Sequence, residues 1–362
     1  MRRRQGRVSS YPMAEAAAAP SLEEPVGFEA LGDDLVLRAC LRAPFMTHGS
    51  LHAVCHRFKS LLRSDDFRKQ RLEYGLAEYG VVLAGGARYK STDCWMLSEG
   101  QWRSIPSMSG PRYHTCSVII DNEMWVMGGE YGGPLATVEV YSPKTNSWRS
   151  CTPMSQRRTG AVAGVVNGRL VVAGGYCGHH DLTSAEAYTG IGWTPLPPMP
   201  HAALFATACV LNGRLYVIGG VGSNRLQVLE MTEENGLSWS RKADLPANRS
   251  FAASVVHQDR IWVMGGKLND RPTTSVLTYD AGADVWGTGP PLPAPCACCR
   301  AAPLDGGVFL FDHRRSLRPA AGAHRATPVG LTAYAYKNAA WSEAARPPRA
   351  VFVSACGGVL LG

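Results

Sequence analysis

The sequence predicts a mainly β protein in which a small all-α module precedes a six-bladed β-propeller. Three observations predict it: glycine pairs at a regular spacing, tryptophans at the same spacing, and an N-terminal segment whose apolar residues follow a helical period. The chain of 362 residues is long enough for two domains or a repeat array, and its 45% of hydrophobic residues can build a substantial core.

The glycine pairs each close an apolar run and are separated by steps of 43, 46, 45 and 46 residues; they are Gly85-Gly86, Gly128-Gly129, Gly174-Gly175, Gly219-Gly220 and Gly265-Gly266. The tryptophans follow with steps of 46, 45, 46, 47 and 55 residues, at Trp102, Trp148, Trp193, Trp239, Trp286 and Trp341. Two unrelated markers in phase indicate a repeat of four-stranded units, which bury both faces only when they stack radially.

Turn residues divide each unit into four short strands. In the second unit we expect strands at 114–120, 124–127, 138–141 and 147–150. Asn167-Gly168 and Asn212-Gly213 favour type I′ hairpins between the first two strands of their units. Proline-rich segments such as 195–200 mark the crossing to the next unit, and each tryptophan is expected to fill the gap between blades.

The two ends of the repeat region predict how the propeller closes. The first unit begins at Tyr79 with its second strand, and residues 349–356 resemble a missing first strand. A blade built from both ends of the chain would hide two sheet edges, which gives six blades; five blades with a frayed end are the alternative. The sixth unit has Asp312-His313 in place of a glycine pair, and residues 314–328 have the character of an insertion.

These units resemble kelch repeats, over residues 79–362. The residues that carry the resemblance are Arg112, Gly128-Gly129, Tyr141 and Trp148, then Arg158, Gly174-Gly175, Tyr188 and Trp193, then Arg249, Gly265-Gly266, Tyr279 and Trp286. In the first unit Trp95 takes the tyrosine position, and the fourth unit is expected to have His201 in place of the arginine.

The N-terminal part has a different rhythm. Residues 1–26 are expected to be a disordered tail, with an organellar transit peptide as the alternative. Residues 27–74 carry apolar side chains at helical spacing, with Asp33 as a candidate N-cap and Pro44 as an interruption of the first helix. A segment this short often needs a partner to cover its apolar face.

The pattern of residues 27–74 resembles an F-box, carried by Leu31-Gly32-Asp33-Asp34-Leu35, Cys40-Leu41, Ala43-Pro44, Val54-Cys55, Arg57-Phe58 and Ser60-Leu61-Leu62. Gly32 stands where family members usually have proline, and Phe58 where they often have tryptophan. The resemblance implies a substrate receptor of an SCF (Skp–cullin–F-box) ubiquitin ligase that performs no catalysis itself. The candidate residues for the Skp adaptor are Leu31, Leu35, Leu41, Pro44, Val54, Phe58 and Leu61; alternatively, some of them hold the helices together.

The kelch resemblance also implies a target-binding face, because the loops after the glycine pairs lie on one face of such propellers. The candidate target-binding residues are Arg88, Lys90, Tyr131, His179, Asn224, Arg225, Lys267 and Arg271. Four of these are cations that could form a basic ring for an acidic or phosphorylated peptide. An ordinary solvated set of loops is the alternative.

Composition argues against other partner classes. The net charge is +8, and four arginines among the first seven residues supply half of it, so no nucleic-acid partner is expected. No apolar stretch approaches the length of a membrane span. The 11 cysteines show no disulfide framework, which favours a reducing compartment, the cytoplasm or the nucleus.

No catalytic, metal or cofactor site is predicted. Cys296 and Cys299 have zinc-like spacing, but no second cysteine or histidine pair follows at a suitable distance, and 179–181 form a loop cluster without fixed geometry. Two other functions remain open: a kelch scaffold that joins no ligase, and a propeller oxidase, which would need converging histidine and tyrosine ligands.

Overall fold

The computed structural model describes residues 40–41, 67, 78–85, 92–98, 101–222, 227–232, 237–304, 307–312, 332–344 and 355–361. The chain divides into two compact units, Met1–Leu76 and Ala77–Gly362. In the first unit Cys40, Leu41 and Phe67 have helical backbone and are buried. The remainder of the predicted helical module lies outside the described residues, as does the predicted insertion at 314–328. Among the described residues, no helix has the length and apolar character to cross a membrane.

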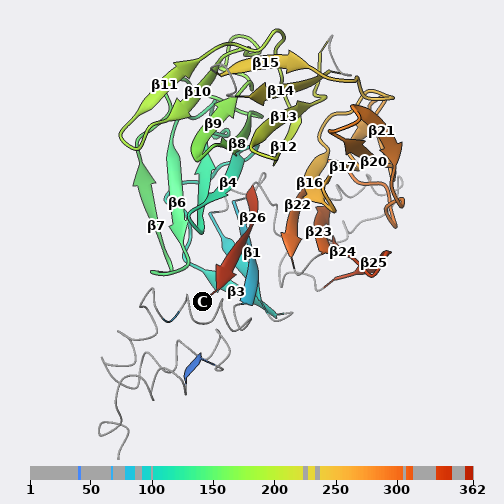
Figure 1. Ribbon diagram of the computed structural model, residues 1–362. Coiled ribbons are helices and arrows are strands. Elements are labelled where there is room, and N and C mark those ends of the chain that lie inside the picture. Colours follow the sequence, from blue (N-terminus) through green and yellow to red (C-terminus); the bar gives the residue numbers. More distant parts are fainter. Residues whose placement is uncertain are drawn as a thin grey trace, which may run out of the picture. The chain divides into compact units, whose positions relative to one another are not determined.

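The second unit consists of six four-stranded antiparallel sheets, the blades of a propeller (Figure 1). Blade 1 contains β26 (Ala355–Leu361), β1 (Glu78–Ala84), β2 (Cys94–Ser98) and β3 (Gln101–Ile105); blade 2 contains β4 (Cys116–Ile120), β5 (Glu123–Met127), β6 (Val138–Ser142) and β7 (Ser147–Cys151); blade 3 contains β8 (Val162–Val166), β9 (Arg169–Ala173), β10 (Ala185–Tyr188) and β11 (Trp193–Leu196).

The other three blades repeat the pattern. Blade 4 contains β12 (Thr207–Leu211), β13 (Arg214–Ile218), β14 (Val228–Thr232) and β15 (Ser238–Arg241); blade 5 contains β16 (Ala253–His257), β17 (Arg260–Met264), β20 (Val276–Asp280) and β21 (Val285–Thr288); blade 6 contains β22 (Arg300–Leu304), β23 (Gly307–Asp312), β24 (Thr332–Lys337) and β25 (Ala340–Glu343). A short ribbon of β18 (Lys267–Leu268) and β19 (Arg271–Pro272) extends from blade 5.

The six innermost strands touch one another around a closed circle, in the order β4, β8, β12, β16, β22, β26 and back to β4. The prediction of six blades is therefore confirmed. The C-terminal strand lies beside β1, with Glu78 opposite Leu361 and Ala84 opposite Ala355 (Figure 1). This corrects the predicted position at 349–356, which only overlaps the observed strand. The β-branched residues of 349–356 favoured the earlier position, but seven residues of pairing with β1 outweigh the low strand propensity of Gly357 and Gly358.

The predicted hairpin turns have the backbone that type I′ requires. Asn167 and Gly168 have φ of 46° and 78°, and Asn212 and Gly213 have φ of 51° and 72°. Both residues of each turn are left-handed, as this turn type demands. The turns join β8 to β9 and β12 to β13, so the register of these hairpins follows directly from the sequence.

The recurring tryptophans join each blade to the preceding one. The indole N–H of Trp148 donates to the carbonyl of Pro106 at 2.7 Å, and that of Trp193 donates to Thr152 at 2.9 Å. Trp239, Trp286 and Trp341 make the same bond to Pro197, Ala243 and Pro290. The prediction that tryptophan fills the space between blades is confirmed, and the indole N–H adds a directional bond to the apolar contact.

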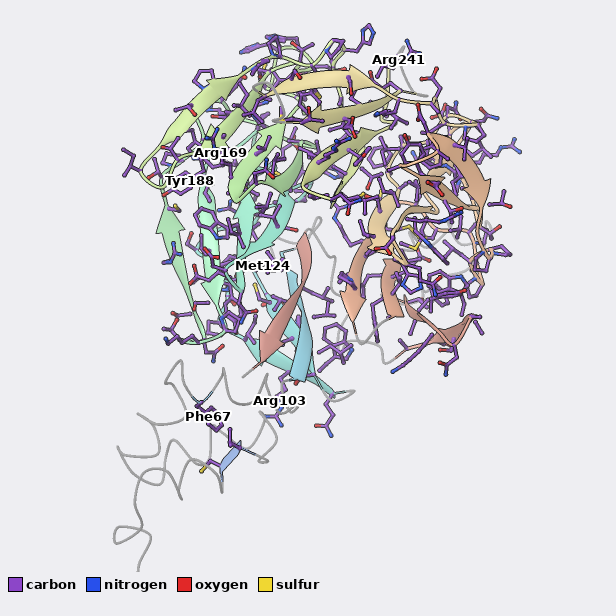
Figure 2. The ribbon with its side chains drawn as sticks, viewed as in Figure 1. Phe67, Arg103, Met124, Arg169, Tyr188 and Arg241 are labelled. Carbon is purple, nitrogen blue, oxygen red and sulfur yellow. A yellow bond between two sulfur atoms is a disulfide. The ribbon has the colours of Figure 1, made fainter. Side chains whose placement is uncertain are left out.

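The hydrophobic core lies between facing blades. Val171 and Ala173 of blade 3 pack in one cluster with Leu215 and Val217 of blade 4. Met124 in blade 2 is fully buried, whereas Arg241 lies at the outer edge in Figure 2. Cys116 is a free thiol inside this core, and burial raises its pKa to about 12, so it behaves as the small hydrophobe that the sequence predicts.

The glycine pairs allow the backbones of neighbouring blades to approach closely. Gly219 has φ of 68°, and a Cβ added there would overlap the carbonyl oxygen of Arg249 in the next unit. The N–H of Gly220 donates to that same carbonyl at 2.8 Å. The first glycine of the pair is therefore required for its backbone conformation and for the space that it leaves.

Gly219→Ala is expected to lower the free energy of unfolding by about 2 kcal/mol or more, because left-handed strain and overpacking each cost about 1–3 kcal/mol. Gly168→Ala is the matched control: its φ is 78°, but nothing lies within 4 Å of its added Cβ. Urea unfolding of both variants separates strain from overlap, and an equal loss in the two would contradict the close-approach explanation.

Candidate target-binding face

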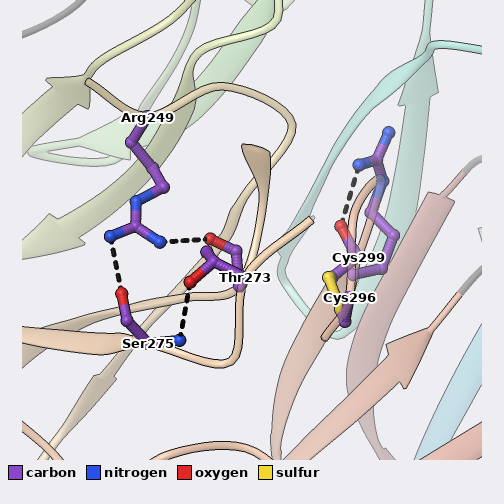
Figure 3. The surroundings of a disulfide bond; sticks show 7 residues. Arg249, Thr273, Ser275, Cys296 and Cys299 are labelled. Carbon is purple, nitrogen blue, oxygen red and sulfur yellow. Dashed lines mark hydrogen bonds between the residues drawn. A yellow bond between two sulfur atoms is a disulfide. The ribbon is translucent and has the colours of Figure 1, made fainter. Parts of the chain in front are cut away.

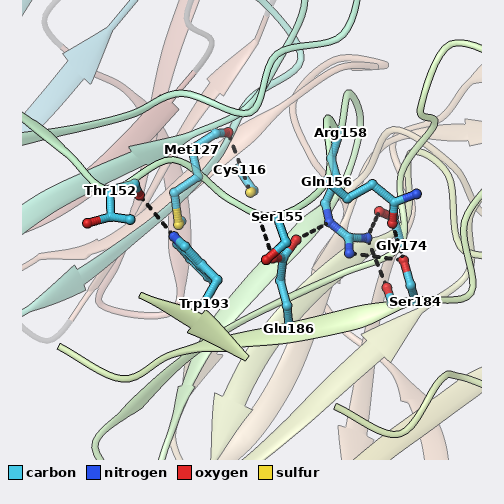
Figure 4. A network of polar contacts seen from close by, with 10 residues as sticks. All are labelled: Cys116, Met127, Thr152, Ser155, Gln156, Arg158, Gly174, Ser184, Glu186 and Trp193. Atoms are coloured by element: carbon cyan, nitrogen blue, oxygen red, sulfur yellow. Dashed lines mark hydrogen bonds and ion pairs between the residues drawn. The ribbon is translucent and has the colours of Figure 1, made fainter. Parts of the chain in front are cut away.

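A buried arginine organises the loops at one end of blade 3 (Figure 4). Arg158 precedes the first glycine of its pair by 16 residues, and its Nη1 donates to the carbonyl of Gly174 at 2.9 Å. Its Nε pairs with Glu186 at 3.0 Å, and both side chains are almost fully buried. The other oxygen of Glu186 accepts the N–H of Ser155 at 2.8 Å. The network ties the segment before β8 to the glycine pair and to β10.

The main chain at the same position joins two blades. The N–H of Gly129 in blade 2 donates to the carbonyl of Arg158 at 2.8 Å, and the N–H of Arg158 donates to Leu135 at 2.9 Å. We call the position 16 residues before the first glycine the arginine slot. Arg112 fills it in blade 2, where it pairs with Glu139.

The structure corrects the fourth unit. The N–H of Gly175 donates to the carbonyl of Ala203, so Ala203 occupies the arginine slot there, while His201 is exposed. Leu229 takes the position of the paired glutamate, as its register opposite Val217 shows. In the sixth unit the N–H of Gly266 donates to Cys296, which places a cysteine in the slot. The expected histidine was wrong because the proline-rich segments before the slot hide its spacing.

Two residues beyond the slot, the backbone of five consecutive blades turns left-handed and forms an arc of hydrogen bonds. The arc consists of His114, Gly160, Phe205, Phe251 and Cys298, with φ of 55°, 63°, 52°, 55° and 60°. Each N–H from Gly160 onward donates to the carbonyl of the arc residue in the preceding blade, at 2.9 to 3.0 Å. Since each residue lies two positions before an innermost strand, the arc follows one end of the propeller axis. We call it the axial arc.

Three aromatic side chains of the axial arc gather into one cluster. The rings of Phe205 and Phe251 stack with centroids 4.3 Å apart, and the His114 ring meets the edge of Phe205 at 4.8 Å. All three side chains are partly exposed. We call them the axial aromatic cluster. A bulky residue rarely adopts a left-handed backbone, so an aromatic side chain is retained here at a conformational cost.

Gly160 makes room for this cluster. A Cβ on Gly160 would lie 2.7 Å from two ring atoms of Phe205. Because Gly160 has no side chain, His114 of blade 2 reaches Phe205 of blade 4 across blade 3. The same slot holds glycine in one blade and phenylalanine in two others, so the backbone accepts glycine and the aromatic side chains serve another purpose.

The loops after the glycine pairs border the axial arc. Ser250, just before Phe251, bridges to Lys267, just after the glycine pair of blade 5, and Tyr113 bridges to Glu130 in the same way in blade 2. The Lys267 Nζ lies 5.1 Å from the centroid of the Phe251 ring. A cation thus adjoins the aromatic cluster, which can receive an apolar side chain with an acidic group beside it.

The described candidate residues are spread over these loops. Lys267 and Arg271 stand on β18 and β19 of one ribbon, Tyr131 is 43% exposed in blade 2, and His179 is exposed in blade 3. Leu41, a candidate for the Skp adaptor, is buried in the first unit. The other candidates lie outside the described residues: Leu31, Leu35, Pro44, Val54, Phe58, Leu61, Arg88, Lys90, Asn224 and Arg225. The basic ring stays a prediction, and the described loops also carry Glu130, Asp181 and Asp270.

The sequence analysis missed the axial aromatic cluster. A signal existed: each arc residue precedes the first position of its glycine pair by 14 residues, including Cys298 before Asp312. Alignment of the repeats on that pair would have placed His114, Phe205 and Phe251 in one column. Their convergence, however, depends on the closed circle of blades, because the three residues belong to separate repeats.

Comparisons with known proteins support the repeat assignment. A family model described as the Kelch motif matches residues 111–155 and 157–189. "Kelch-like protein 23" of Pongo abelii is 33% identical over 92 residues, which is 25% of this chain and 16% of that protein. "F-box/kelch-repeat protein At1g30090" of Arabidopsis thaliana is 28% identical over 170 residues, which is 43% of each chain. The alignments thus span less than half the length of these relatives.

The fold comparison agrees. A solved structure titled "Structure of YjhT" superposes with a TM-score of 0.57 at 16% identity, covering 70% of this chain and 91% of that chain. At this identity the likeness concerns the fold alone. The described part of the chain is therefore a six-bladed kelch propeller, a fold that generally serves protein interaction, and its relatives include proteins named F-box/kelch-repeat proteins.

Proposed function

We propose that this protein is the target-binding subunit of an SCF ubiquitin ligase: residues 27–74 dock on a Skp-type adaptor, and the propeller binds a target protein through the axial aromatic cluster and the loops around it. Through the adaptor the chain would join a cullin–RING ligase in the cytoplasm or nucleus. Its contribution would be proximity, because the assembled ligase raises the concentration of target lysines near a charged conjugating enzyme.

The observation that carries the target-binding part is the axial aromatic cluster beside Lys267. Partly exposed aromatic residues that pack together are typical anchors of protein interfaces. Phe205 and Phe251 keep this arrangement in a left-handed backbone that glycine would adopt without strain. We infer that the target contributes an apolar side chain to the cluster and an acidic group near the Lys267 Nζ.

The part that concerns the ligase is supported by the F-box resemblance of residues 27–74 and by the printed names of the F-box/kelch relatives. The second candidate function, a kelch scaffold outside any ligase, would use the same propeller face. Reconstitution separates the two: the full chain, co-expressed with a Skp adaptor and purified, should form a stoichiometric complex that also retains the cullin subunit. Purification of the intact chain without the adaptor would favour the scaffold.

Leu35→Asp is expected to abolish capture of the adaptor, because an unpaired charge in a buried interface costs about 3 kcal/mol or more, over 100-fold in affinity. Leu22→Asp, the same change in the predicted tail, is the matched control and should bind normally. Titration of the adaptor by calorimetry measures both. Unchanged binding by Leu35→Asp would refute the assignment of this residue to the adaptor surface.

A further inference from the structure

Three unusual residues of blade 6 stand where other blades have the arginine and the first glycine. Cys296 fills the arginine slot, and Cys299 lies three residues later, directly before β22. Asp312 fills the position of the first glycine, because Phe311 pairs with Arg300 as Met264 pairs with Ala253 in blade 5. Blade 6 therefore departs from the repeat at corresponding points that lie far apart in the sequence.

These departures meet in space. One sulfur of each cysteine and one carboxylate oxygen of Asp312 all lie within 4.8 Å of one another. Cys296 and Asp312 are 1% exposed and Cys299 is fully buried. Both sulfur atoms also lie 3.1 Å from the position that a Cβ of Gly265 would take, so they face the glycine pair of blade 5 (Figure 3).

The corresponding place in other blades holds a cation. The Nη1 atoms of Arg158 and Arg249 each donate to the carbonyl of the first glycine of their own pair, at 2.9 Å. In blade 6 the arginine slot supplies a sulfur ligand instead, and the glycine position supplies a carboxylate. The exchange replaces a cationic side chain by a set of ligands for a cation.

We propose that reduced Cys296 and Cys299, together with Asp312, bind one zinc ion at the start of blade 6. Two thiolates separated by two residues favour zinc over magnesium or calcium, which prefer oxygen ligands. Three protein ligands leave one position of a tetrahedral site for water. The ion would fix residues 296–299, including Cys298, whose N–H donates to Phe251 in the axial arc at 2.9 Å.

In the structure the two sulfur atoms are bonded to each other. Zinc binding therefore requires prior reduction: a dithiol reductant gives two electrons and two protons to the disulfide, which becomes two thiols while the reductant becomes its own disulfide. On binding the ion, the two thiols release two protons to solvent. Seven other described cysteines are free, which agrees with a reducing compartment where this step is available.

The test measures zinc in the full chain, purified under reductant with added Zn²⁺ and then dialysed. Elemental analysis is expected to find about one zinc per chain in the wild type and in Cys298→Ser, the control thiol between the two ligands. Cys296→Ser, Cys299→Ser and Asp312→Asn should each lose at least tenfold in zinc affinity. Cobalt substitution of the wild type should give a thiolate charge-transfer band, which requires no variant to fold.

Three results would overturn the proposal. A folded wild type that retains no zinc and shows no cobalt–thiolate band, a Cys296–Cys299 disulfide that persists under reductant, or zinc retained equally by all three ligand variants would each do so. None of these results bears on adaptor binding, so failure of the zinc site leaves the proposed ligase function intact.

Discussion

Arg158→Ala is expected to destabilise the propeller by about 3–5 kcal/mol, because removal of one member of a buried ion pair leaves the other charge uncompensated. Arg158 and Glu186 are each 2% exposed, and all the other contacts of the guanidinium are hydrogen bonds to Gly174 and Ser184. Glu186 would keep only the N–H of Ser155 among its described partners. Urea unfolding followed by tryptophan fluorescence measures the loss.

Arg249→Ala is the matched variant in blade 5. Arg249 is 3% exposed, but its described partners are the neutral oxygens of Gly265 and Ser275, and Leu277 stands where Glu186 stands in blade 3. Burial alone lowers the pKa of this guanidinium, with no carboxylate to oppose the shift. Its removal leaves no buried anion, so the expected loss is about 1–3 kcal/mol, from hydrogen bonds alone. Equal losses in the two variants would show that the carboxylate contributes nothing.

Blade 4 indicates how to rescue the first variant. It has Ala203 in the arginine slot, Leu229 in place of the glutamate and Gln227 in place of Ser184, and the amide of Gln227 donates to Ala202 at 3.2 Å. Arg158→Ala combined with Ser184→Gln and Glu186→Leu copies that arrangement. We expect the triple variant to recover at least half of the lost stability, since apolar replacement of a buried ion pair is often neutral.

The sequence allowed prediction of the blades because their markers act locally. Asn167-Gly168 sets its own hairpin, and each tryptophan lies at a fixed distance from its glycine pair. The strands of blade 2 begin and end within two residues of their predicted limits. Features that depend on closure of the circle were harder to find: the position of β26, the true occupant of the arginine slot in blade 4, and the meeting of Cys296 and Cys299 with Asp312.

The candidate site divides in the same way. Loop residues such as Lys267 and Arg271 follow the glycine pairs directly, so the sequence places them. The axial aromatic cluster unites residues from blades 2, 4 and 5, and it exists only because Gly160 leaves space between them. No local pattern encodes that convergence.

Phe205→Gly is expected to weaken target binding by about 30-fold or more, since loss of an interface anchor typically costs about 2 kcal/mol. Stability should change by less than about 1 kcal/mol, because relief of the left-handed strain, about 1–3 kcal/mol, offsets the lost stacking on Phe251. The backbone of the arc would persist, as it does at Gly160.

The measurement has two stages. Proteins captured by the wild-type chain from a cell lysate are identified by mass spectrometry, and the affinity of the principal one is then determined by calorimetry for each variant. Ile191→Ser is the control, because Ile191 is 89% exposed in the turn between the outer strands β10 and β11 and lies away from the axial arc. If Phe205→Gly binds the target as the wild type does while Ile191→Ser weakens binding, the target contacts the outer rim and not the axial aromatic cluster. A large loss of stability in Phe205→Gly would instead show that the aromatic side chain is retained for packing, and the conformational argument for a binding role would fail.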